Sequence, residues 1–359
     1  MKILIVLPND TLGGAEQCLK QIASYYKYED VTIFFLQTFN TKSWADLEKE
    51  TNQFYCSLNS RFLGILKFIH TINSQKIEYD YIFTSHISIN ALIGSLINLK
   101  ILKTNKFVAR ESTSIFLRYK GIKLLLYQLF YKIGYKKIDL LICQTDLMKT
   151  QLINGFKSID QRTLVKTIPN PIDFDFLIKE RQKPNKLDFS YDFIVSAGRL
   201  IDEKGYDILI DAFYNIKKTK KDIKLIILGE GDSKESLNEQ IVRLNLTNEV
   251  LLAGHVTNVL DYFKKAKLCV VSSRIEGFPN VLLQMMSQNE AVVSTLCAGD
   301  ISHIEGLITC EPNDKFALIN ALENALAQQN RTRKTFDTYL ENRSIVKFMN
   351  KIDSVLKNR

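Results

Sequence analysis

Strand-length apolar runs alternate with helix-length segments along the whole chain, and this alternation constrains the fold more than any other feature of the sequence. In the first half the expected strands are Ile3–Leu7, Val31–Leu36, Tyr81–Thr84, Lys106–Ala109 and Leu140–Cys143. In the second half they are Asp192–Ala197, Leu225–Leu228, Val250–Leu252, Leu268–Val271, Ala291–Ser294 and Gly306–Thr309. Strands that are apolar throughout are typical of parallel sheets buried on both faces. The pattern therefore predicts an α/β fold with doubly wound parallel sheets.

The chain has 359 residues, too many for one ordinary hydrophobic core, which favours two domains. Between the two strand series lies Thr167-Ile-Pro-Asn-Pro-Ile-Asp-Phe174, whose two prolines cannot continue a helix or a central strand. We therefore expect Rossmann-like domains over 1–168 and 169–339, with a C-terminal helix, 340–359, that packs back on the first. Two such domains would form a cleft, and ligands would bind beyond the carboxyl ends of the strands.

Cysteine and histidine usage predicts no disulfide framework and no zinc site. The six cysteines form no CxxC pair, and two of them, Cys143 and Cys269, lie in apolar strand-like runs. This favours reduced core thiols in a cytoplasmic protein. The four histidines are scattered. No run of eighteen apolar residues is present, so we expect no membrane-spanning helix, and the first residues do not resemble a signal peptide.

The positive charge is concentrated in one segment, 115–137. The chain has a formal net charge of +9, and no acidic residue lies between Ser112 and Ile138. The basic residues there are Arg118, Lys120, Lys123, Lys132, Lys136 and Lys137. They alternate with leucines, isoleucines and aromatic residues, which suits a helix at an anionic membrane surface. The alternative is a core helix with a solvated basic face. No nucleic-acid-binding motif accompanies the charge, so no nucleic-acid partner is expected.

Motifs with ligand-binding chemistry follow several of the expected strands. After the first strand, Gly13-Gly14-Ala15-Glu16 combines glycines, which allow close approach to a ligand, with the start of a helix near Ala15. The alternative is a tight turn that needs glycine only for its backbone. This motif is not the GxGxxG dinucleotide fingerprint.

The segment Gly198-Arg-Leu-Ile-Asp-Glu-Lys-Gly205 follows a strand of the second half. Arg199 and Lys204 flank this turn, and a guanidinium and an ammonium that converge there would bind a diphosphate. A solvated charged turn is the alternative. Two weaker signals also follow strands: Gly229 in Leu228-Gly-Glu-Gly-Asp232, and His255-Val256, which could lie beside a flat base.

The segment 272–284, Ser-Ser-Arg-Ile-Glu-Gly-Phe-Pro-Asn-Val-Leu-Leu-Gln, joins a buried strand to an apolar helix. Glu276 lies in the turn, and Phe278, Pro279 and Asn280 lead into the helix, whose first amides are free to bind an anion. Gln284 is eight positions after Glu276, about two helical turns, and is expected to point into the same cleft. Such a turn can hold a phosphate on its amides and a sugar hydroxyl on its carboxylate.

Taken together, these motifs resemble the retaining glycosyltransferases of family 4, which have the GT-B fold, and in particular those that assemble bacterial cell-surface polysaccharides. The motifs that carry the resemblance are GGAE at 13–16, IPNPID at 168–173, SAGRLIDEKG at 196–205, LGEGD at 228–232 and SSRIEGFPNVLLQ at 272–284. The resemblance implies roles for the donor side. It assigns Arg199 and Lys204 to the donor diphosphate, Glu276 to the donor sugar, Phe278–Asn280 to the phosphates, Gly13 and Gly14 to the diphosphate and acceptor, Gly198 and Gly229 to the donor loops, and His255-Val256 to the base.

One position departs from the family pattern. The family has a second glutamate where this chain has Gln284, and that glutamate usually contacts the donor ribose. An amide oxygen can still accept a hydrogen bond from a ribose hydroxyl, but without charge assistance.

The motifs specify the acceptor side less closely than the donor side. Where relatives often carry a histidine, this chain has Arg110 and Glu111, and Glu111 is expected to orient or deprotonate the acceptor hydroxyl. The alternative for Glu111 is a capping or ion-pairing carboxylate. His86 and Glu16 are further acceptor-side candidates, with His86 lining the site.

The resemblance implies transfer of a sugar from a UDP- or GDP-sugar to a hydroxyl of a polyprenyl-diphosphate-linked or saccharide acceptor. It also implies that no metal and no cofactor are needed, because protein cations stabilise the leaving group. Segment 115–137 would then hold the enzyme on the inner face of the plasma membrane. Two alternatives remain: a nucleotide-sugar epimerase of the same architecture, and a catalytically impaired nucleotide-sugar-binding protein, which Gln284 makes conceivable.

Overall fold

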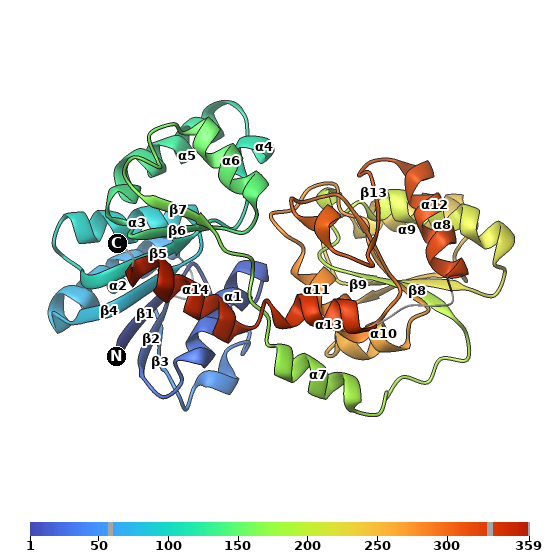
Figure 1. The fold of residues 1–359 in the computed structure, drawn as a ribbon, viewed down its shortest axis with the longest axis horizontal. Helices are drawn as coiled ribbons and strands as arrows, with labels where there is room; N and C mark the ends of the chain where they lie inside the picture. Colours follow the sequence, from blue (N-terminus) through green and yellow to red (C-terminus); the bar gives the residue numbers. More distant parts are fainter. Residues whose placement is uncertain (57–59, 329–332, 358–359) are drawn as a thin grey trace. The chain divides into compact units, whose positions relative to one another are not determined.

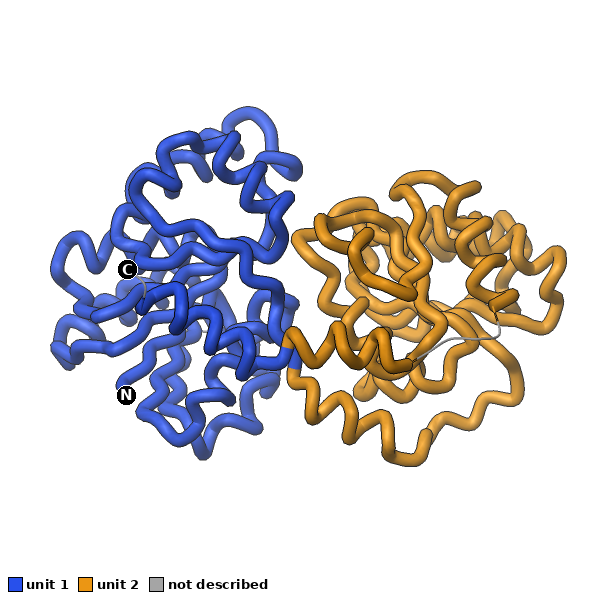
Figure 2. The backbone as a smooth tube through the Cα atoms, viewed as in Figure 1, with its two compact units in different colours: residues 1–172, 344–359 blue, residues 173–343 orange. Residues whose placement is uncertain are grey.

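A computed structural model describes residues 1–56, 60–328 and 333–357. The chain divides into two compact units, coloured separately in Figure 2. Unit 1 comprises residues 1–172 and 344–359, and unit 2 comprises 173–343. The chain passes between them twice, after Ile172 and after Arg343. The sequence prediction placed these crossings a few residues earlier, at 168 and 339.

Unit 1 contains a seven-stranded sheet in the order β3-β2-β1-β4-β5-β6-β7, with parallel pairing throughout (Figure 1). Its strands are β1 (Lys2–Leu7), β2 (Asp30–Phe35), β3 (Asn52–Tyr55), β4 (Glu78–Thr84), β5 (Lys103–Arg110), β6 (Leu140–Cys143) and β7 (Leu164–Thr167). Its helices are α1 (Gly14–Tyr25), η1 (Ala45–Leu47), α2 (Arg61–Gln75), α3 (Ile87–Asn98), α4 (Ile115–Arg118), α5 (Gly121–Gly134), η2 (Tyr135–Lys137), α6 (Asp146–Gly155) and α14 (Ile345–Lys357).

Helices cover both faces of this sheet, as β1 illustrates. Leu4 and Val6 join a buried cluster with α2, α3, α5 and α6, whereas Ile3, Ile5 and Leu7 join another with α1 and α14. Successive residues of a strand point to opposite faces, so a strand buried on both sides is apolar throughout. The continuous apolar runs in the sequence are a consequence of this double cover.

Unit 2 contains a six-stranded parallel sheet in the order β10-β9-β8-β11-β12-β13. Its strands are β8 (Phe193–Ala197), β9 (Lys224–Leu228), β10 (Val250–Gly254), β11 (Leu268–Val271), β12 (Val292–Thr295) and β13 (Ile308–Cys310). Its helices are α7 (Phe174–Gln182), η3 (Asp202–Lys204), α8 (Tyr206–Thr219), α9 (Lys234–Arg243), α10 (Val259–Lys265), α11 (Asn280–Gln288), η4 (Ile301–His303), α12 (Lys315–Ala327) and α13 (Arg333–Glu341). One buried cluster packs α8, α9 and α12 against the sheet.

The predicted fold class, with two doubly wound parallel sheets, is confirmed. Two strands were missed, β3 with the sequence NQFY and β7 with LVKT. Both are edge strands, which are partly exposed and therefore lack a long apolar run. The C-terminal helix α14 belongs to unit 1, where Phe348, Met349, Ile352 and Leu356 enter the core.

All six cysteines are buried free thiols. In the described parts of the chain, no helix is both long and apolar enough to cross a membrane.

Candidate functional site

Both sheets have a topological switch point, where the chain returns to the other side of its first strand. In unit 2 the first strand, β8, lies between β9 and β11, and in unit 1 β1 lies between β2 and β4. The loops that leave two such neighbouring strands diverge and open a crevice at the carboxyl edge, where ligands bind in doubly wound sheets. The loops after β8 and β11, and after β1 and β4, are therefore the places to examine.

In unit 2, the switch point brings Lys204 and Glu276 together. Lys204 ends η3 after β8, and Glu276 lies in the loop after β11. The Lys204 Nζ atom is 2.5 Å from Glu276 Oε1, and both side chains are largely buried. Ser273 Oγ donates a hydrogen bond of 3.0 Å to the same carboxylate oxygen. Two motifs that are far apart in the sequence thus contribute a cation and a carboxylate to one ion pair.

Arg199 and the neighbouring glycines lie in the same loop as Lys204. The Arg199 side chain is exposed. Gly198 and Gly229 contact each other so closely that a Cβ atom on Gly229 would lie 2.0 Å from the Gly198 carbonyl oxygen. Both have positive φ angles, of 153° and 134°. A close approach of the loops after β8 and β9 explains both glycines, so their presence does not by itself require a ligand.

The loop after β11 leads into α11 through Phe278 and Pro279, which are buried, with Pro279 as the N-cap residue. The first turn of α11, which begins at Asn280, contains no acidic residue, so no carboxylate of the helix itself competes with an anion for the positive end of the helix dipole. Gln284 is half-buried in this helix. The expected spacing of two helical turns from Glu276 is wrong, because Glu276 precedes the start of α11 by four residues.

His255 follows β10, at the outer edge of the sheet, and is exposed, while Val256 is half-buried. The Gly254 carbonyl before them accepts a hydrogen bond of 2.7 Å from the Gly229 amide. These residues therefore share the carboxyl edge with Lys204 but lie two strands from β8. Their contact with a base stays a prediction.

In unit 1, Glu16 of α1 and His86, the N-cap residue of α3, meet at the switch point. The His86 Nε2 atom is 3.2 Å from Glu16 Oε1. Burial acts to raise the pKa of Glu16, but the hydrogen bond from His86, its charge and the amides of Gly13 and Glu16 outweigh burial, and the pKa is lowered. A Cβ atom on Gly13 would lie 2.7 Å from Glu16 Oε2, so the carboxylate rests against Gly13. Gly13 and Gly14 themselves are exposed.

Glu111 is enclosed within unit 1. Its Oε1 and Oε2 atoms accept hydrogen bonds from Tyr135 Oη at 2.8 Å and Tyr131 Oη at 3.1 Å, respectively. Burial raises the pKa of Glu111 to about 7, against the opposing effects of these hydrogen bonds and of the Arg110 charge. Glu111 is only 1% exposed. Its carboxylate would therefore have to break its hydrogen bonds with both tyrosines to contact an acceptor hydroxyl. Its role in catalysis stays a prediction.

Arg110 is also buried. Its Nη1 atom donates to Ser85 Oγ at 2.8 Å, and its Nη2 atom donates to Asn170 Oδ1. Ser85 immediately precedes His86 in the chain. Arg110 therefore binds the residue next to His86. A direct role of Arg110 at the acceptor stays a prediction.

Several residues of these sites escaped the sequence analysis. Ser273 and Arg274 lie inside the segment 272–284, but only the structure shows that they bind Glu276 and the loop of Lys204. Tyr131 and Tyr135 appeared in the sequence as part of the basic aromatic segment, with no sign that they face a buried carboxylate. Among the described residues, no cluster of three or more His, Cys, Asp or Glu side chains is arranged to hold a metal ion.

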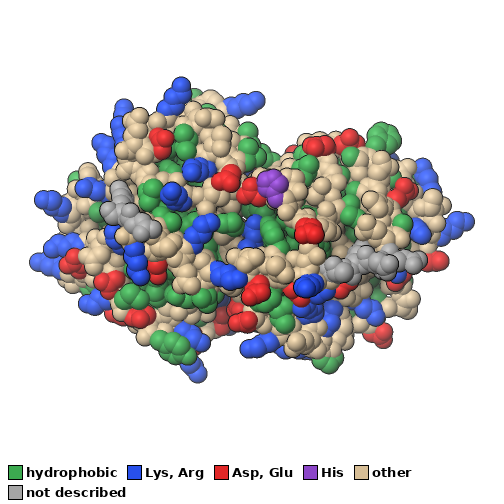
Figure 3. All heavy atoms as spheres, viewed as in Figure 1, with side chains coloured by type: hydrophobic (Ala, Val, Ile, Leu, Met, Phe, Trp, Pro, Cys, Tyr) green, Lys and Arg blue, Asp and Glu red, His purple; other side chains and the backbone are tan. Residues whose placement is uncertain are grey.

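The segment 115–137 forms α4, α5 and η2, and its residues divide into two sets. Tyr131, Gly134 and Tyr135 are buried, whereas six large apolar side chains of α5 are exposed. The exposed set is Ile122, Leu125, Leu126, Leu129, Phe130 and Ile133. Lys and Arg side chains border this region of unit 1 (Figure 3). Helix α5 thus has a buried side and an exposed side that carries both apolar and basic residues, and binding of the exposed side to a membrane stays a prediction.

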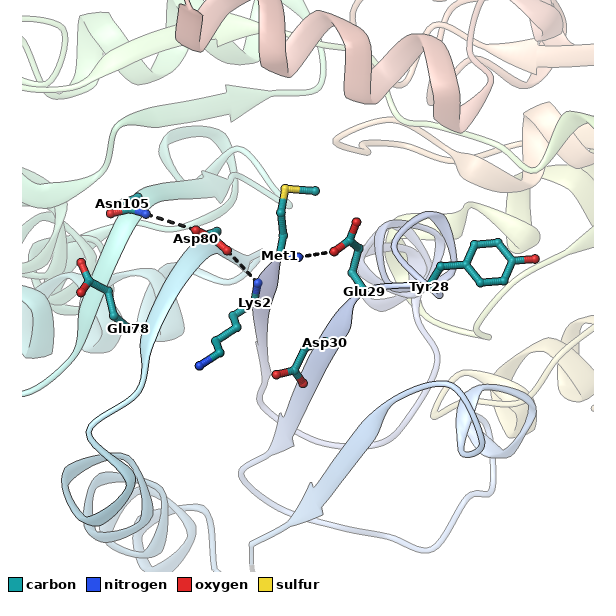
Figure 4. A pocket seen from close by; sticks show the side chains of 8 residues that line it. All are labelled: Met1, Lys2, Tyr28, Glu29, Asp30, Glu78, Asp80 and Asn105. Carbon is teal, nitrogen blue, oxygen red and sulfur yellow. Dashed lines mark hydrogen bonds and ion pairs between the residues drawn. The ribbon is translucent and has the colours of Figure 1, made fainter.

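A pocket lies at the opposite, amino edge of the unit 1 sheet (Figure 4). It is lined by Met1, Lys2, Tyr28, Glu29, Asp30, Glu78, Asp80 and Asn105. Its interactions join the strand ends: the Lys2 amide donates to Asp80, the Asn105 amide donates to Asp80, and the Met1 amine pairs with Glu29. This pocket contains none of the motif residues and lies at the edge of the sheet opposite the unit 1 switch point.

Two doubly wound domains, each with its own parallel sheet, are the architecture of the GT-B class. The structure of Anabaena HepE in complex with UDP and glucose has this fold, with a TM-score of 0.81, 20% identity and full coverage of both chains. The family model for glycosyl transferases group 1 matches residues 192–328, which include Arg199, Lys204, Glu276 and Gln284. The match lies within unit 2.

Two curated relatives are similar to larger parts of the chain. An uncharacterized glycosyltransferase of Methanocaldococcus jannaschii is 34% identical over 248 residues, which cover 66% of this chain and 59% of the relative. The chain thus matches about three fifths of that relative's length. The N-acetylgalactosamine-N,N'-diacetylbacillosaminyl-diphospho-undecaprenol 4-alpha-N-acetylgalactosaminyltransferase of Campylobacter jejuni is 27% identical over 261 residues, which cover 72% of this chain and 67% of the relative.

Proposed function

We propose that this protein is a retaining glycosyltransferase that moves a sugar from a UDP- or GDP-sugar to an acceptor hydroxyl. The ion pair of Lys204 with Glu276 at the switch point of unit 2 is the observation that carries the proposal. Without donor, the two charges compensate each other. A bound diphosphate would compete for Lys204, and Glu276 would then be free to accept hydrogen bonds from the sugar hydroxyls.

The same residues suit the charge that develops during transfer. As the bond between the anomeric carbon and the phosphate oxygen breaks, negative charge grows on the leaving diphosphate, where Lys204, Arg199 and the first amides of α11 would stabilise it. The acceptor oxygen forms its bond on the same face of the sugar, and the departing phosphate takes the acceptor's proton. On this mechanism, protein cations replace a metal ion, and no cofactor takes part.

For the acceptor we propose a polyprenyl-diphosphate-linked saccharide or a free saccharide in the assembly of a cell-surface polysaccharide, such as O-antigen, capsule or lipopolysaccharide. The name of the C. jejuni relative includes diphospho-undecaprenol, which supports a lipid-linked acceptor. The exposed apolar side chains of α5, with basic residues beside them, support peripheral binding to the inner face of the plasma membrane.

Release of nucleoside diphosphate from a panel of UDP- and GDP-sugars, with and without a polyprenyl-diphosphate-linked saccharide, tests the proposal. A thermal-shift screen with the same compounds first selects the donor that the protein binds. Acceptor-dependent release, with a product whose anomeric configuration is retained by NMR, is the expected result. Conversion of the donor without an acceptor would instead indicate an epimerase, and binding without turnover would indicate a nucleotide-sugar-binding protein.

A further inference from the structure

We propose that Arg274 is a positioning residue that holds Lys204 in place against Glu276, an inference that rests on the proposed function. Arg274 lies two residues before Glu276, in the loop after β11. Lys204 lies in the separate loop after β8. The loop after β8 must be held at a fixed position relative to the loop after β11 if the Lys204 ammonium and the Glu276 carboxylate are to bind the same donor. The contacts of Arg274 connect these two loops.

The backbone of the Lys204 turn is bound to the Arg274 loop at every carbonyl of η3. The Arg274 amide donates to the Glu203 carbonyl at 2.7 Å, and Ser272 Oγ donates to the Lys204 carbonyl at 2.9 Å. The Arg274 guanidinium Nη1 donates to the Asp202 carbonyl at 2.6 Å. The loop that carries Glu276 therefore determines the position of the turn that carries Lys204.

The Arg274 guanidinium also binds the first turn of α8, directly after Lys204. Its Nη1 and Nη2 atoms donate to the two carboxylate oxygens of Asp207 at 2.8 and 2.6 Å. Burial acts to raise the pKa of Asp207, but the hydrogen bonds and charge of Arg274 outweigh it and lower the pKa, so the pair is ionised at neutral pH. A bidentate pair of this kind fixes orientation as well as distance.

The junction between these two anchors leaves little room for adjustment. Gly205, between Lys204 and α8, has a φ angle of 63°, and a Cβ atom there would lie 2.3 Å from the Ser272 carbonyl oxygen. The loops after β8 and β11 are thus in close contact at Gly205 as well. Loss of the guanidinium would release the Asp202 carbonyl and the start of α8 together, and a misplacement of about 1 Å at a reacting site can reduce the rate roughly hundredfold.

A double-mutant cycle with Arg274→Ala and Lys204→Ala tests this role in the full-length protein. The readouts are the affinity for UDP and GDP by calorimetry and kcat/KM with the donor that is turned over. We expect Arg274→Ala to reduce both by roughly tenfold or more in the wild-type background. In the Lys204→Ala background, Arg274→Ala should reduce the affinity and kcat/KM by less than about twofold, because a residue that acts through Lys204 then has no ammonium to position. Equal losses in both backgrounds, or wild-type values for Arg274→Ala, would overturn the inference.

Conservative variants and a matched control separate positioning from general stability. Arg274→Lys should give intermediate values, because an ammonium cannot make the bidentate contact with Asp207. Arg181 forms a similar bidentate pair with Asp337 elsewhere in unit 2, so Arg181→Ala should lower the melting temperature without changing kcat/KM. If the wild type binds neither UDP nor GDP and turns over no sugar nucleotide, the proposed function itself fails. If the wild type binds and Arg274→Ala binds equally well, only the positioning role fails.

Discussion

The guanidinium of Arg343 lies over the ring of Phe278, with 4.5 Å between the guanidinium carbon and the ring centroid. Phe278 belongs to the loop that enters α11, and Arg343 is the last residue of unit 2. The next residue, Ser344, forms a parallel bridge with Ile172 in unit 1. A residue of the proposed donor loop is therefore in contact with the side chain of the last residue of unit 2.

Replacement of Arg343 by lysine should destabilise unit 2 and weaken donor binding. The guanidinium also lies 4.7 Å from the Tyr339 ring, and a lysine ammonium cannot stack in the same way on both rings. We expect a loss of about 1 kcal/mol in the free energy of unfolding, and a several-fold increase in donor KM. Thermal denaturation and steady-state kinetics measure the two effects. An unchanged melting temperature would show that the stacking contributes nothing to stability.

Replacement of Lys204 or Arg199 by alanine should reduce turnover by roughly hundredfold or more, since each would remove a charge that stabilises the leaving diphosphate. Arg199 is exposed, so its loss should leave the melting temperature unchanged. Lys234, an exposed lysine of unit 2 that pairs with the exposed Glu230, supplies the control, and Lys234→Ala should retain wild-type kinetics. Unchanged turnover in Lys204→Ala would refute the assignment of the donor site.

Glu111 should make the stability of unit 1 fall as the pH rises from about 4.5 to about 7. Its pKa is about 7 in the folded protein against 4.5 in the unfolded chain, so between these values the folded state binds more protons. The free energy of unfolding then decreases with pH, by roughly 3 kcal/mol in total. Glu111→Gln, which keeps the shape but does not titrate, should remove this slope. Denaturant titrations at pH 5 and pH 8 measure it, and an equal slope in wild type and variant would contradict the assignment.

Replacement of Gln284 by glutamate should preserve or increase the affinity for nucleotide, by up to roughly tenfold. A carboxylate at this position in α11 would accept a ribose hydroxyl with charge assistance, which roughly doubles the strength of a hydrogen bond. Calorimetry with UDP and GDP measures the affinity. Gln284→Ala, which removes the acceptor entirely, should weaken binding. If Gln284→Glu abolishes binding, this residue does not occupy the ribose position.

The exposed side of α5 should bind anionic vesicles. Ile122 and Leu125 are 79% and 64% exposed, so replacing both by glutamate should not affect folding. Burial of one such side chain in a bilayer contributes about 1.5 kcal/mol or more, so each change should weaken vesicle binding roughly tenfold. Phe316 of α12, which is 72% exposed in unit 2, serves as the control, and Phe316→Glu should float like the wild type. A wild-type protein that stays in the soluble fraction in vesicle flotation would contradict the proposal.

Much of the fold could be predicted because its central strands are buried on both faces. Strands such as β1, β8 and β11 are apolar throughout, and their positions follow from the sequence almost to the residue. The edge strands β3 and β7 could not be found in this way, since half-exposed strands resemble loops in composition. The predicted spacing of two helical turns between Glu276 and Gln284 is wrong because it extends a helical repeat across a loop. Helix α11 begins only at Asn280, after Pro279 and the buried Phe278.

The fold class, the two strand series and the motifs at their carboxyl ends follow from the sequence alone, because periodicity and turn chemistry depend on neighbours along the chain. Which motif residues come into contact depends on the three-dimensional packing of the chain. Lys204 and Glu276 are 72 residues apart and pair because β8 and β11 are adjacent in the sheet. The Glu111 carboxylate accepts hydrogen bonds from Tyr131 and Tyr135 because α5 and η2 pack near the end of β5. Such contacts arise from strand order and helix packing, and no local pattern in the chain encodes them.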